Sequence, residues 1–156
     1  MRIHLIAVGE KMPDWVQSGF EEYARRLPRT CRVLLREVAP GRRGKNADID
    51  RAVREEADRI EAVLPDNALV VALDVRGRAL STEQLAERLD DWLQGGRDIA
   101  LLVGGPDGLH PDLLARAELR WSLSALTFPH PLVRVILAEQ LYRAWSVLAN
   151  HPYHRG

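Results

Sequence analysis

Two short runs of uninterrupted apolar residues constrain the fold of this chain more than any other feature. Residues 69–73 and 99–103 carry no polar side chain. Runs of this length are typical of strands, and a strand that is apolar on both faces must be covered on both faces. A mostly parallel sheet with helices packed on either side provides that cover. The chain is therefore predicted to fold as an α/β protein.

Predicted strands and helices alternate along the rest of the chain. Apolar runs indicate further strands at residues 3–8, 33–38 and 121–126. Helical patterns cover residues 13–27, 48–63, a segment that opens at Ser81, and residues 111–117 and 131–150. The sequence contains no linker, low-complexity tract or internal repeat, so residues 1–156 are expected to form a single domain.

The charge balance gives the whole protein no general attraction to nucleic acid. Its 22 basic and 22 acidic side chains cancel, so any affinity for RNA must be local. Arg42, Arg43 and Lys45 lie in a segment with two glycines and no apolar residue. We expect these three side chains to contact the RNA backbone. Another arginine-rich stretch, residues 25–36, is better explained as a solvated charged surface.

The remaining composition disfavours several classes of protein. Cys31 is the only cysteine, so an internal disulfide is impossible, and the thiol is expected to be inert. The longest apolar runs are too short to cross a bilayer, and the N-terminus does not resemble a signal peptide. We therefore expect a cytoplasmic protein without a membrane partner. His151 and His154 lack further ligands at suitable spacing, so no metal site is expected.

Three segments that follow predicted strands are candidates for a ligand site. In an open parallel sheet, ligands bind just beyond the carboxyl ends of the strands. The segments are Asp74–Gly77, Gly104–Gly108 and Thr127–Pro131. Glycines let a ligand approach the backbone closely, although tight turns alone would also explain them. Their spacing fits neither the dinucleotide fingerprint nor a P-loop, which disfavours a nicotinamide-dependent oxidoreductase and a nucleoside triphosphatase.

The residues that precede the last of these segments combine small and apolar side chains. Residues 122–128 read Ser-Leu-Ser-Ala-Leu-Thr-Phe and are followed by a proline. Such a stretch could form an apolar slot with backbone polar groups, which suits an adenine ring. A plain core strand that runs into a proline turn would produce the same pattern.

The final predicted helix is apolar around most of its circumference. Only Glu139, Arg143 and Ser146 share a narrow polar strip. Such a helix is either central to the core or buried in a subunit interface, and we favour a homodimer. Glu139 and Arg143 are four residues apart and can form an ion pair, either as an ordinary surface pair or as part of a site.

Six blocks of this sequence closely resemble the bacterial ribosomal RNA large-subunit methyltransferase H family. They are Gly9–Trp15, Gly44–Ile49, Gly104–Leu109, Ser122–His130, Tyr142–Trp145 and His151–His154. The resemblance runs from one end of the chain to the other, and the blocks keep the order of the family. It implies a SPOUT-type α/β knot with a C-terminal trefoil knot, which no periodicity predicts.

The resemblance also implies an activity. Members of the family use S-adenosylmethionine to methylate N3 of a pseudouridine in a stem-loop of large-subunit ribosomal RNA, and they act as homodimers. We expect the substrate to be the assembled ribosome. By position, the cofactor contacts of the family fall on Leu73, Gly104, Leu123, Ser124, Ala125, Leu126, Thr127 and Phe128. One departure lies in the segment 72–77, where some members carry different residues before the glycine, but a backbone contact would survive it.

A mechanism follows from the chemistry of this reaction. The sulfonium methyl is already activated, so the protein must align the donor and the nucleophile and remove the N3 proton. We expect His154, from the tail of a partner subunit, or Glu139 to take or relay that proton. Arg143 would hold the nascent anion or a phosphate, and Tyr153 belongs to the same set. The alternative is a ribosome-associated RNA-binding protein of the same fold without catalysis, which would not need to bind S-adenosylmethionine.

Overall fold

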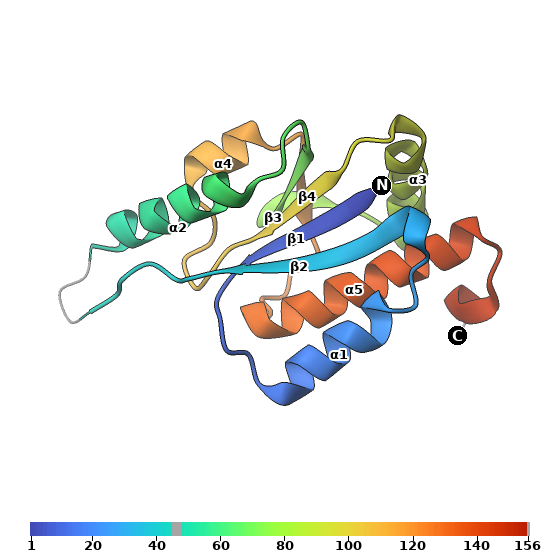
Figure 1. Cartoon of the computed structure of the whole chain (residues 1–156), viewed down its shortest axis with the longest axis horizontal. Helices are drawn as coiled ribbons and strands as arrows, with labels where there is room; N and C mark the ends of the chain where they lie inside the picture. Colours follow the sequence, from blue (N-terminus) through green and yellow to red (C-terminus); the bar gives the residue numbers. More distant parts are fainter. Residues whose placement is uncertain (45–47, 156) are drawn as a thin grey trace.

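A five-stranded parallel sheet forms the centre of the molecule (Figure 1). The computed structural model describes residues 1–44 and 48–155. The strands lie in the order β2-β1-β4-β3-β5, and every adjacent pair is parallel. They are β1 (Arg2–Val8), β2 (Arg32–Val38), β3 (Leu69–Ala79), β4 (Ile99–Val103) and β5 (Leu119–Ser122). The predicted α/β class is confirmed.

Helices cover both faces of the sheet, as the doubly apolar strands required (Figure 1). One face carries α1 (Asp14–Ala24), α3 (Thr82–Gly95) and α5 (His130–Leu148). The other carries α2 (Ile49–Val63) and the short α4 (Pro111–Arg116). There are also two single turns of 3-10 helix. η1 (Arg29–Cys31) precedes β2, and η2 (Pro152–Arg155) ends the described chain. No helix of the described residues is long and apolar enough to span a membrane.

The alternation of side chains along β1 explains the two cores. Ile3 and Leu5 pack toward α1, α3 and α5, whereas Ile6 and Val8 pack toward α2 and α4. This division arises because successive side chains of a strand point to opposite faces of the sheet. Every residue of β4, the middle strand, is buried, and its bounds match the predicted run at residues 99–103.

Two strand predictions were wrong at their ends. β3 does not stop at residue 73 but runs on to Ala79, with an irregularity between Leu73 and Arg78 in its pairing with β5. Gly77 permits this close pairing, because a Cβ there would lie 2.6 Å from the carbonyl oxygen of Arg120. The segment Asp74–Gly77 is therefore an irregular part of a strand rather than a loop.

The predicted strand at residues 121–126 was shifted. β5 ends at Ser122, and residues 123–129 form an irregular segment. The cause is local hydrogen bonding, since Ser122 Oγ donates to Ser124 O at 3.1 Å and Ser124 Oγ accepts from Leu126 N at 2.9 Å. Serine side chains that bond nearby backbone groups in this way compete with the hydrogen bonds of a strand.

The apolar helix α5 lies at the centre of its layer, between α1 and α3 and against the sheet. No residue from 130 to 147 is exposed. Ser146, predicted to lie on a polar strip, is buried and donates a hydrogen bond to Arg143 O at 2.6 Å. Arg134 is also buried, where it pairs with Glu37 and donates to the carbonyl of Gly9. Burial in the core accounts for part of the apolar surface of this helix, whereas Leu132, Val135 and Ile136 are only partly buried within one chain. The trefoil knot implied by the resemblance stays a prediction.

Candidate functional site

A cavity of about 810 Å³ lies beside the irregular part of β3 and the carboxyl ends of β4 and β5. Its lining comes from residues 73–76, 103–109 and 126–130, together with Leu114, Arg120, Trp121, Leu123, Ser124 and Val133. These are the three segments that the sequence singled out, although they are separated by up to 57 positions (130 minus 73). The parallel sheet brings them together because its strands end at one edge.

Most of the residues expected to bind the cofactor lie around this cavity. Leu73, Gly104, Leu123, Ser124, Leu126, Thr127 and Phe128 contribute to its lining. Ala125 belongs to the same irregular segment but does not line the cavity. Leu126 is 70% exposed, which is unusual for a leucine and leaves an apolar side chain at the rim. The alternative of a plain core strand for this stretch is wrong, since residues 123–129 are not a strand.

The glycine-rich segment after β4 forms a tight turn against the cavity. Gly108 has a φ of +76° and donates its N–H to Gly105 O at 3.1 Å. A Cβ on Gly104 would lie 2.5 Å from the carbonyl carbon of Gly108, so no larger residue fits without moving the turn. Glycine is therefore needed here for the turn itself. At its three glycines the turn presents only backbone to a bound ligand.

The lining combines apolar walls with a few fixed polar groups. Leu73, Val103, Leu109, Trp121 and Phe128 supply apolar surface. Polar groups come from the backbone of the glycine-rich turn and from residues that carry polar or charged side chains: Asp74, Arg76, Asp107, Arg120, Ser124, Thr127 and His130. A cavity of this size and character suits a drug-sized ligand with a flat apolar ring and several hydrogen-bonding groups.

His130, the first residue of α5, also lines the cavity, although it was not among the predicted site residues. Burial, followed by the nearby charge of Arg134, lowers the pKa of His130. The imidazole is therefore neutral near neutral pH. Its Nδ1 atom is buried and has no hydrogen-bond partner in residues 1–44 and 48–155. The sequence did contain a signal that could have identified this residue: a histidine between two prolines, within the candidate ligand segment Thr127–Pro131.

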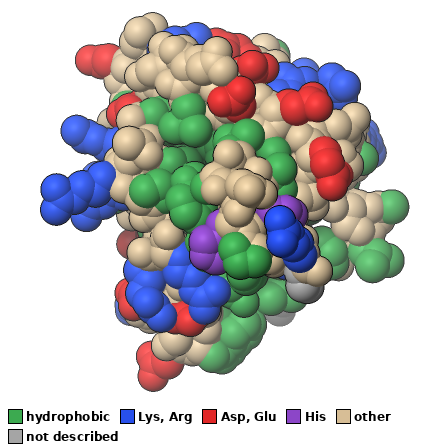
Figure 2. Space-filling model, turned by 90° about the vertical axis from the view of Figure 1, so that its right-hand side faces the viewer, with side chains coloured by type: hydrophobic (Ala, Val, Ile, Leu, Met, Phe, Trp, Pro, Cys, Tyr) green, Lys and Arg blue, Asp and Glu red, His purple; other side chains and the backbone are tan. Residues whose placement is uncertain are grey.

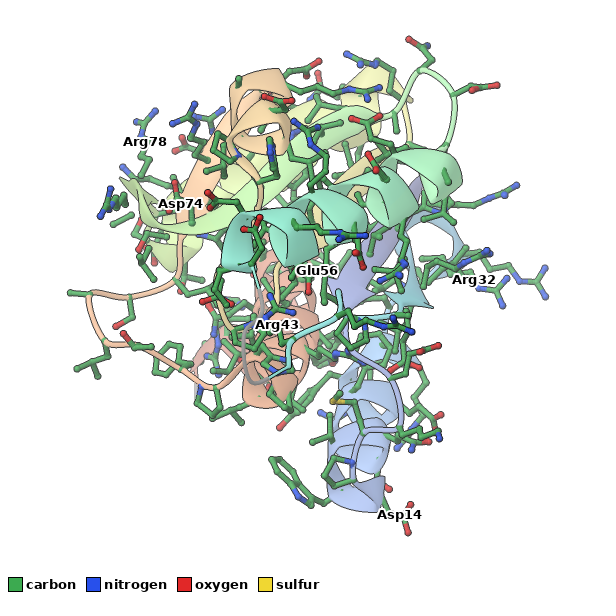
Figure 3. The ribbon with its side chains drawn as sticks, turned by 90° about the vertical axis from the view of Figure 1, so that its left-hand side faces the viewer. Asp14, Arg32, Arg43, Glu56, Asp74 and Arg78 are labelled. Atoms are coloured by element: carbon green, nitrogen blue, oxygen red, sulfur yellow. The ribbon has the colours of Figure 1, made fainter. Side chains whose placement is uncertain are left out.

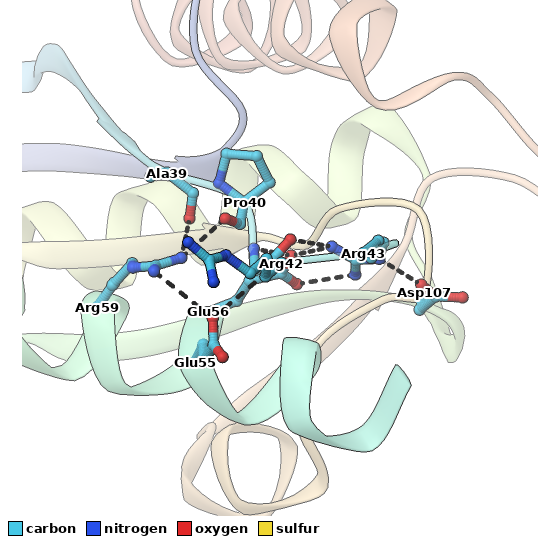
Figure 4. Close-up of polar contacts among 9 residues, drawn as sticks. Ala39, Pro40, Arg42, Arg43, Glu55, Glu56, Arg59 and Asp107 are labelled. Atoms are coloured by element: carbon cyan, nitrogen blue, oxygen red, sulfur yellow. Dashed lines mark hydrogen bonds and ion pairs between the residues drawn. The ribbon is translucent and has the colours of Figure 1, made fainter. Parts of the chain in front are cut away.

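A buried carboxylate ties the segment after β2 to the glycine-rich turn (Figures 3 and 4). Glu56 of α2 is 2% exposed and accepts from Gly41 N at 2.8 Å and from Arg43 Nη1 at 2.6 Å. Arg43 Nε reaches Asp107 Oδ2 at 2.9 Å, and Asp107 lines the cavity. Hydrogen bonds to Glu56 and Asp107 raise the pKa of Arg43, which keeps its guanidinium charged. The arginine is thus a bridge between two carboxylates.

The three residues expected to contact RNA differ in their surroundings. Arg43 is held by Glu56 and Asp107, and its side chain is 21% exposed. Arg42 is exposed, and its backbone N–H donates to Glu55 at 3.3 Å. Lys45 lies outside the described residues.

The residues expected to be catalytic gather at the other end of α5. Arg143 Nε lies 3.2 Å from Glu139 Oε1, and the hydroxyl of Tyr153 donates to Glu139 Oε2 at 3.2 Å. Burial, and then the charge of Glu139, raises the pKa of Tyr153 to about 12. His154 is half-buried, and its Nδ1 atom has no hydrogen-bond partner among the described residues.

The two groups of predicted site residues do not meet within one chain. The cavity lies at the start of α5, beside His130 and Val133, and its lining includes none of the four tail-end residues. From His130 to Arg143 the helix rises by about 20 Å, at ~1.5 Å per residue. No group of three or more histidine, cysteine or acidic side chains suited to a metal ion occurs among the described residues.

Comparison with known proteins gives matches over the whole chain. A family model described as a predicted SPOUT methyltransferase matches residues 1–154. A protein from Alkalilimnicola ehrlichii is 64% identical over 156 residues, 100% of both chains. Another, from Thioalkalivibrio sulfidiphilus, is 61% identical over 155 residues, 99% of both chains. Both relatives are named ribosomal RNA large subunit methyltransferase H.

Solved structures share the fold at low sequence identity. A probable methylase family protein from Haemophilus influenzae superposes with a TM-score of 0.57 at 18% identity, covering 97% of this chain and 68% of its own. A putative methyltransferase from Legionella pneumophila, solved with the bound cofactor SAM, gives 0.51 at 10% identity, covering 92% and 66%. These likenesses concern the fold alone. Together with the match over residues 1–154, the parallel sheet and the full-length relatives establish that the chain belongs to the SPOUT methyltransferase family and groups with the large subunit methyltransferases H.

Proposed function

We propose that this protein is a single-domain enzyme that transfers a methyl group from S-adenosylmethionine to large-subunit ribosomal RNA. The observation that carries the proposal is the identity of 61–64% with relatives of that name over at least 99% of the chain. An enzyme that modifies ribosomal RNA works where ribosomes are, so we place it in the cytoplasm.

The cavity at the strand ends fits S-adenosylmethionine. Its volume of about 810 Å³ lies within the range of roughly 300–1,000 Å³ for small-molecule sites. The turn at residues 104–108 and the stretch 123–128 would hold the cofactor, with Leu73 on the facing strand. When bound, the cofactor supplies a methyl group on a positively charged sulfur, which needs no further activation. The protein then has to hold the donor in line with the nucleophile and exclude water.

N3 of a pseudouridine is the proposed acceptor atom, and its proton must be removed. His154 or Glu139 would take or relay that proton, while Arg143 would hold the anion or a phosphate. Tyr153 has a different task, because its raised pKa of about 12 keeps the hydroxyl protonated near neutral pH. It acts as a hydrogen-bond donor to Glu139 rather than as a base.

The distance along α5 supports a homodimer. Methyl transfer requires contact between donor and acceptor, yet the cavity lining includes none of the four predicted catalytic residues. Arg143 lies about 15 Å along α5 from Val133, the last residue of that helix in the lining, at ~1.5 Å per residue. A second copy that lays its tail across the cavity would bring His154 to the reacting atoms. We therefore propose that each active site combines the cavity of one subunit with the tail of its partner, and that the assembled ribosome is the substrate.

The segment after β2 is proposed to contact RNA through Arg42 and Lys45. Arg42 is exposed, and a solvated guanidinium is suited to a phosphate. Arg43 has a different part, because its bonds to Glu56 and Asp107 fix this segment against the turn that lines the cavity. Alanine at residue 42 should lower the salt dependence of ribosome binding, whereas an unchanged dependence would contradict the contact.

Transfer of a labelled methyl group tests the proposed function. The purified protein is incubated with labelled S-adenosylmethionine and ribosomes that lack the modification, with and without prior pseudouridylation. Incorporation that depends on pseudouridine is the expected result. Binding to ribosomes without cofactor binding or incorporation would overturn the enzyme assignment and favour a non-catalytic RNA-binding protein.

A further inference from the structure

A second hollow, of about 810 Å³, lies at the opposite edge of the sheet, between the end of α1, η1 and the start of β2. Four arginines line it: Arg2, Arg25, Arg29 and Arg32. Glu21 is the only acidic residue in the lining. Figure 2 views the molecule from this end and shows Lys and Arg side chains gathered along one side of the face. We name this hollow the arginine groove.

Three of these arginines form no side-chain ion pair. Arg2, Arg29 and Arg32 are exposed, and none of their guanidinium groups pairs with a carboxylate of the described ranges 1–44 and 48–155. Arg32 extends away from the sheet into solvent (Figure 3). Arg25 differs, because it pairs with Glu22 on the same helix. The groove therefore presents uncompensated positive charge on a protein whose formal net charge is zero.

The arrangement of Arg2 and Arg32 is unfavourable for stability alone. They are register partners on the adjacent strands β1 and β2, so two like charges stand side by side. Like charges at neighbouring positions of a sheet destabilise it. Asp98 offsets part of this repulsion, since it accepts from the backbone N–H of Arg2 at 3.0 Å, but its carboxylate also pairs with His4. An anionic ligand would stabilise this pair of charges.

We propose that the arginine groove binds the phosphate backbone of the substrate RNA. Guanidinium groups match phosphate oxygens in a bidentate geometry, and several arginines around one hollow suit successive phosphates of a strand. The side chains of Phe20, Leu27 and Val33 are buried at its floor and hold the surrounding elements in place. This proposal gives Arg25, Arg29 and Arg32 a role beyond the ordinary solvated surface expected for residues 25–36.

The groove lies beside the tail that the proposed function places in the active site. Arg26, next to the groove residue Arg25, sits over the ring of Tyr153 at 6.0 Å and over Tyr142 at 5.6 Å. RNA held in the groove of one subunit would therefore run toward that subunit's tail and into the cavity of the partner. This inference rests on the proposed function, because it takes ribosomal RNA as the ligand.

The test compares arginine variants of the full-length protein in binding to unmodified ribosomes over a series of salt concentrations. Each neutralised phosphate contributes about 0.9 to the slope of log affinity against log salt. Arg29→Ala/Arg32→Ala should lower this slope by about 1.8 and raise KM for ribosomes, with kcat unchanged. Arg29→Lys/Arg32→Lys keeps both positive charges and should therefore keep most of the slope. If substitution at these positions unfolded the protein, the lysine variant would lose the slope as well.

Arg54→Ala/Arg116→Ala is the matched control. Both of these arginines are exposed, lie on the face covered by α2 and α4, and pair with Asp112 and Glu61. The control removes the same charge but should leave the slope unchanged. An equal decrease in both double variants, or an unchanged slope in Arg29→Ala/Arg32→Ala, would overturn the inference. A shift of Arg29→Ala/Arg32→Ala from dimer to monomer would also overturn the inference, because it would identify the groove as a subunit contact. If the wild type neither binds nor methylates ribosomes, the proposed function itself fails.

Discussion

Replacing Glu56 by alanine should destabilise the protein more than any comparable change on the same helix surface. The carboxylate is 2% exposed, and it accepts from Gly41 N and from two nitrogens of Arg43, at 2.8, 2.6 and 3.3 Å. Its removal leaves the N–H of Gly41, a buried residue, without its acceptor. It also leaves Arg43 with Asp107 as its one remaining carboxylate partner among the described residues.

The magnitude follows from the burial of the two partners. Breaking a buried ion pair costs about 3–5 kcal/mol. The side chain of Arg43 is 21% exposed and keeps its bond to Asp107, so part of its charge can be solvated again. We therefore expect the lower end of that range, about 3 kcal/mol. For a chain of this length, each kcal/mol lowers Tm by roughly 2–4 °C, which gives a decrease of about 6–12 °C.

Thermal unfolding followed by calorimetry measures this decrease, and Glu55→Ala is its control. Glu55 is the preceding residue of α2, and its ion pairs with Arg51 and Arg59 are longer, at 3.5 and 3.6 Å. These pairs, and the exposed hydrogen bond that Glu55 accepts from Arg42 N at 3.3 Å, lie near the surface, so their loss should cost less than about 1 kcal/mol. Equal decreases in Tm for the two variants would refute the argument that burial of Glu56 determines the difference.

Three further predictions concern the cavity, the tail and two buried groups. Gly104→Ala should weaken S-adenosylmethionine binding by about tenfold in calorimetric titration, since overpacking costs ~1–3 kcal/mol. Gly95→Ala is the control and should leave the affinity unchanged, because a Cβ at residue 95 meets nothing within 4 Å. His154→Ala should abolish methyl transfer and spare cofactor affinity; full turnover would refute its role. Burial raises the pKa of Cys31 from 9.0 to about 11, and that of Tyr153 from 10.0 to about 12. The unfolded chain then loses these protons first, so the free energy of unfolding should fall as pH rises from about 9 to 12, and urea titrations that show no decrease would contradict this.

The sequence was informative wherever a structural decision is local. The uninterrupted apolar runs at residues 69–73 and 99–103 predicted strands buried on both faces, and the run at 99–103 gave the bounds of β4. Alternating strand and helix patterns were enough for the α/β class. The glycines after β4 selected one wall of the cavity, because close backbone approach and tight turns both need a residue without a side chain. The ends of β3 and β5 were missed, where cross-strand pairing and serine hydrogen bonds outweigh the apolar pattern. The helix predicted over residues 13–27 ends earlier, at Ala24.

Tertiary structure alone decided the partners of the charged residues. Arg43 has the sequence context of an exposed RNA-binding residue, yet it bridges carboxylates 13 and 64 positions away. Arg134 lies in an apolar helix and is buried against Glu37, 97 positions away. The arginine groove forms because β1 and β2 pair in parallel and place Arg2 beside Arg32. Whether a charge is solvated, paired or left facing a like charge depends on which segments the fold brings together, and hydrophobic periodicity carries no information about that.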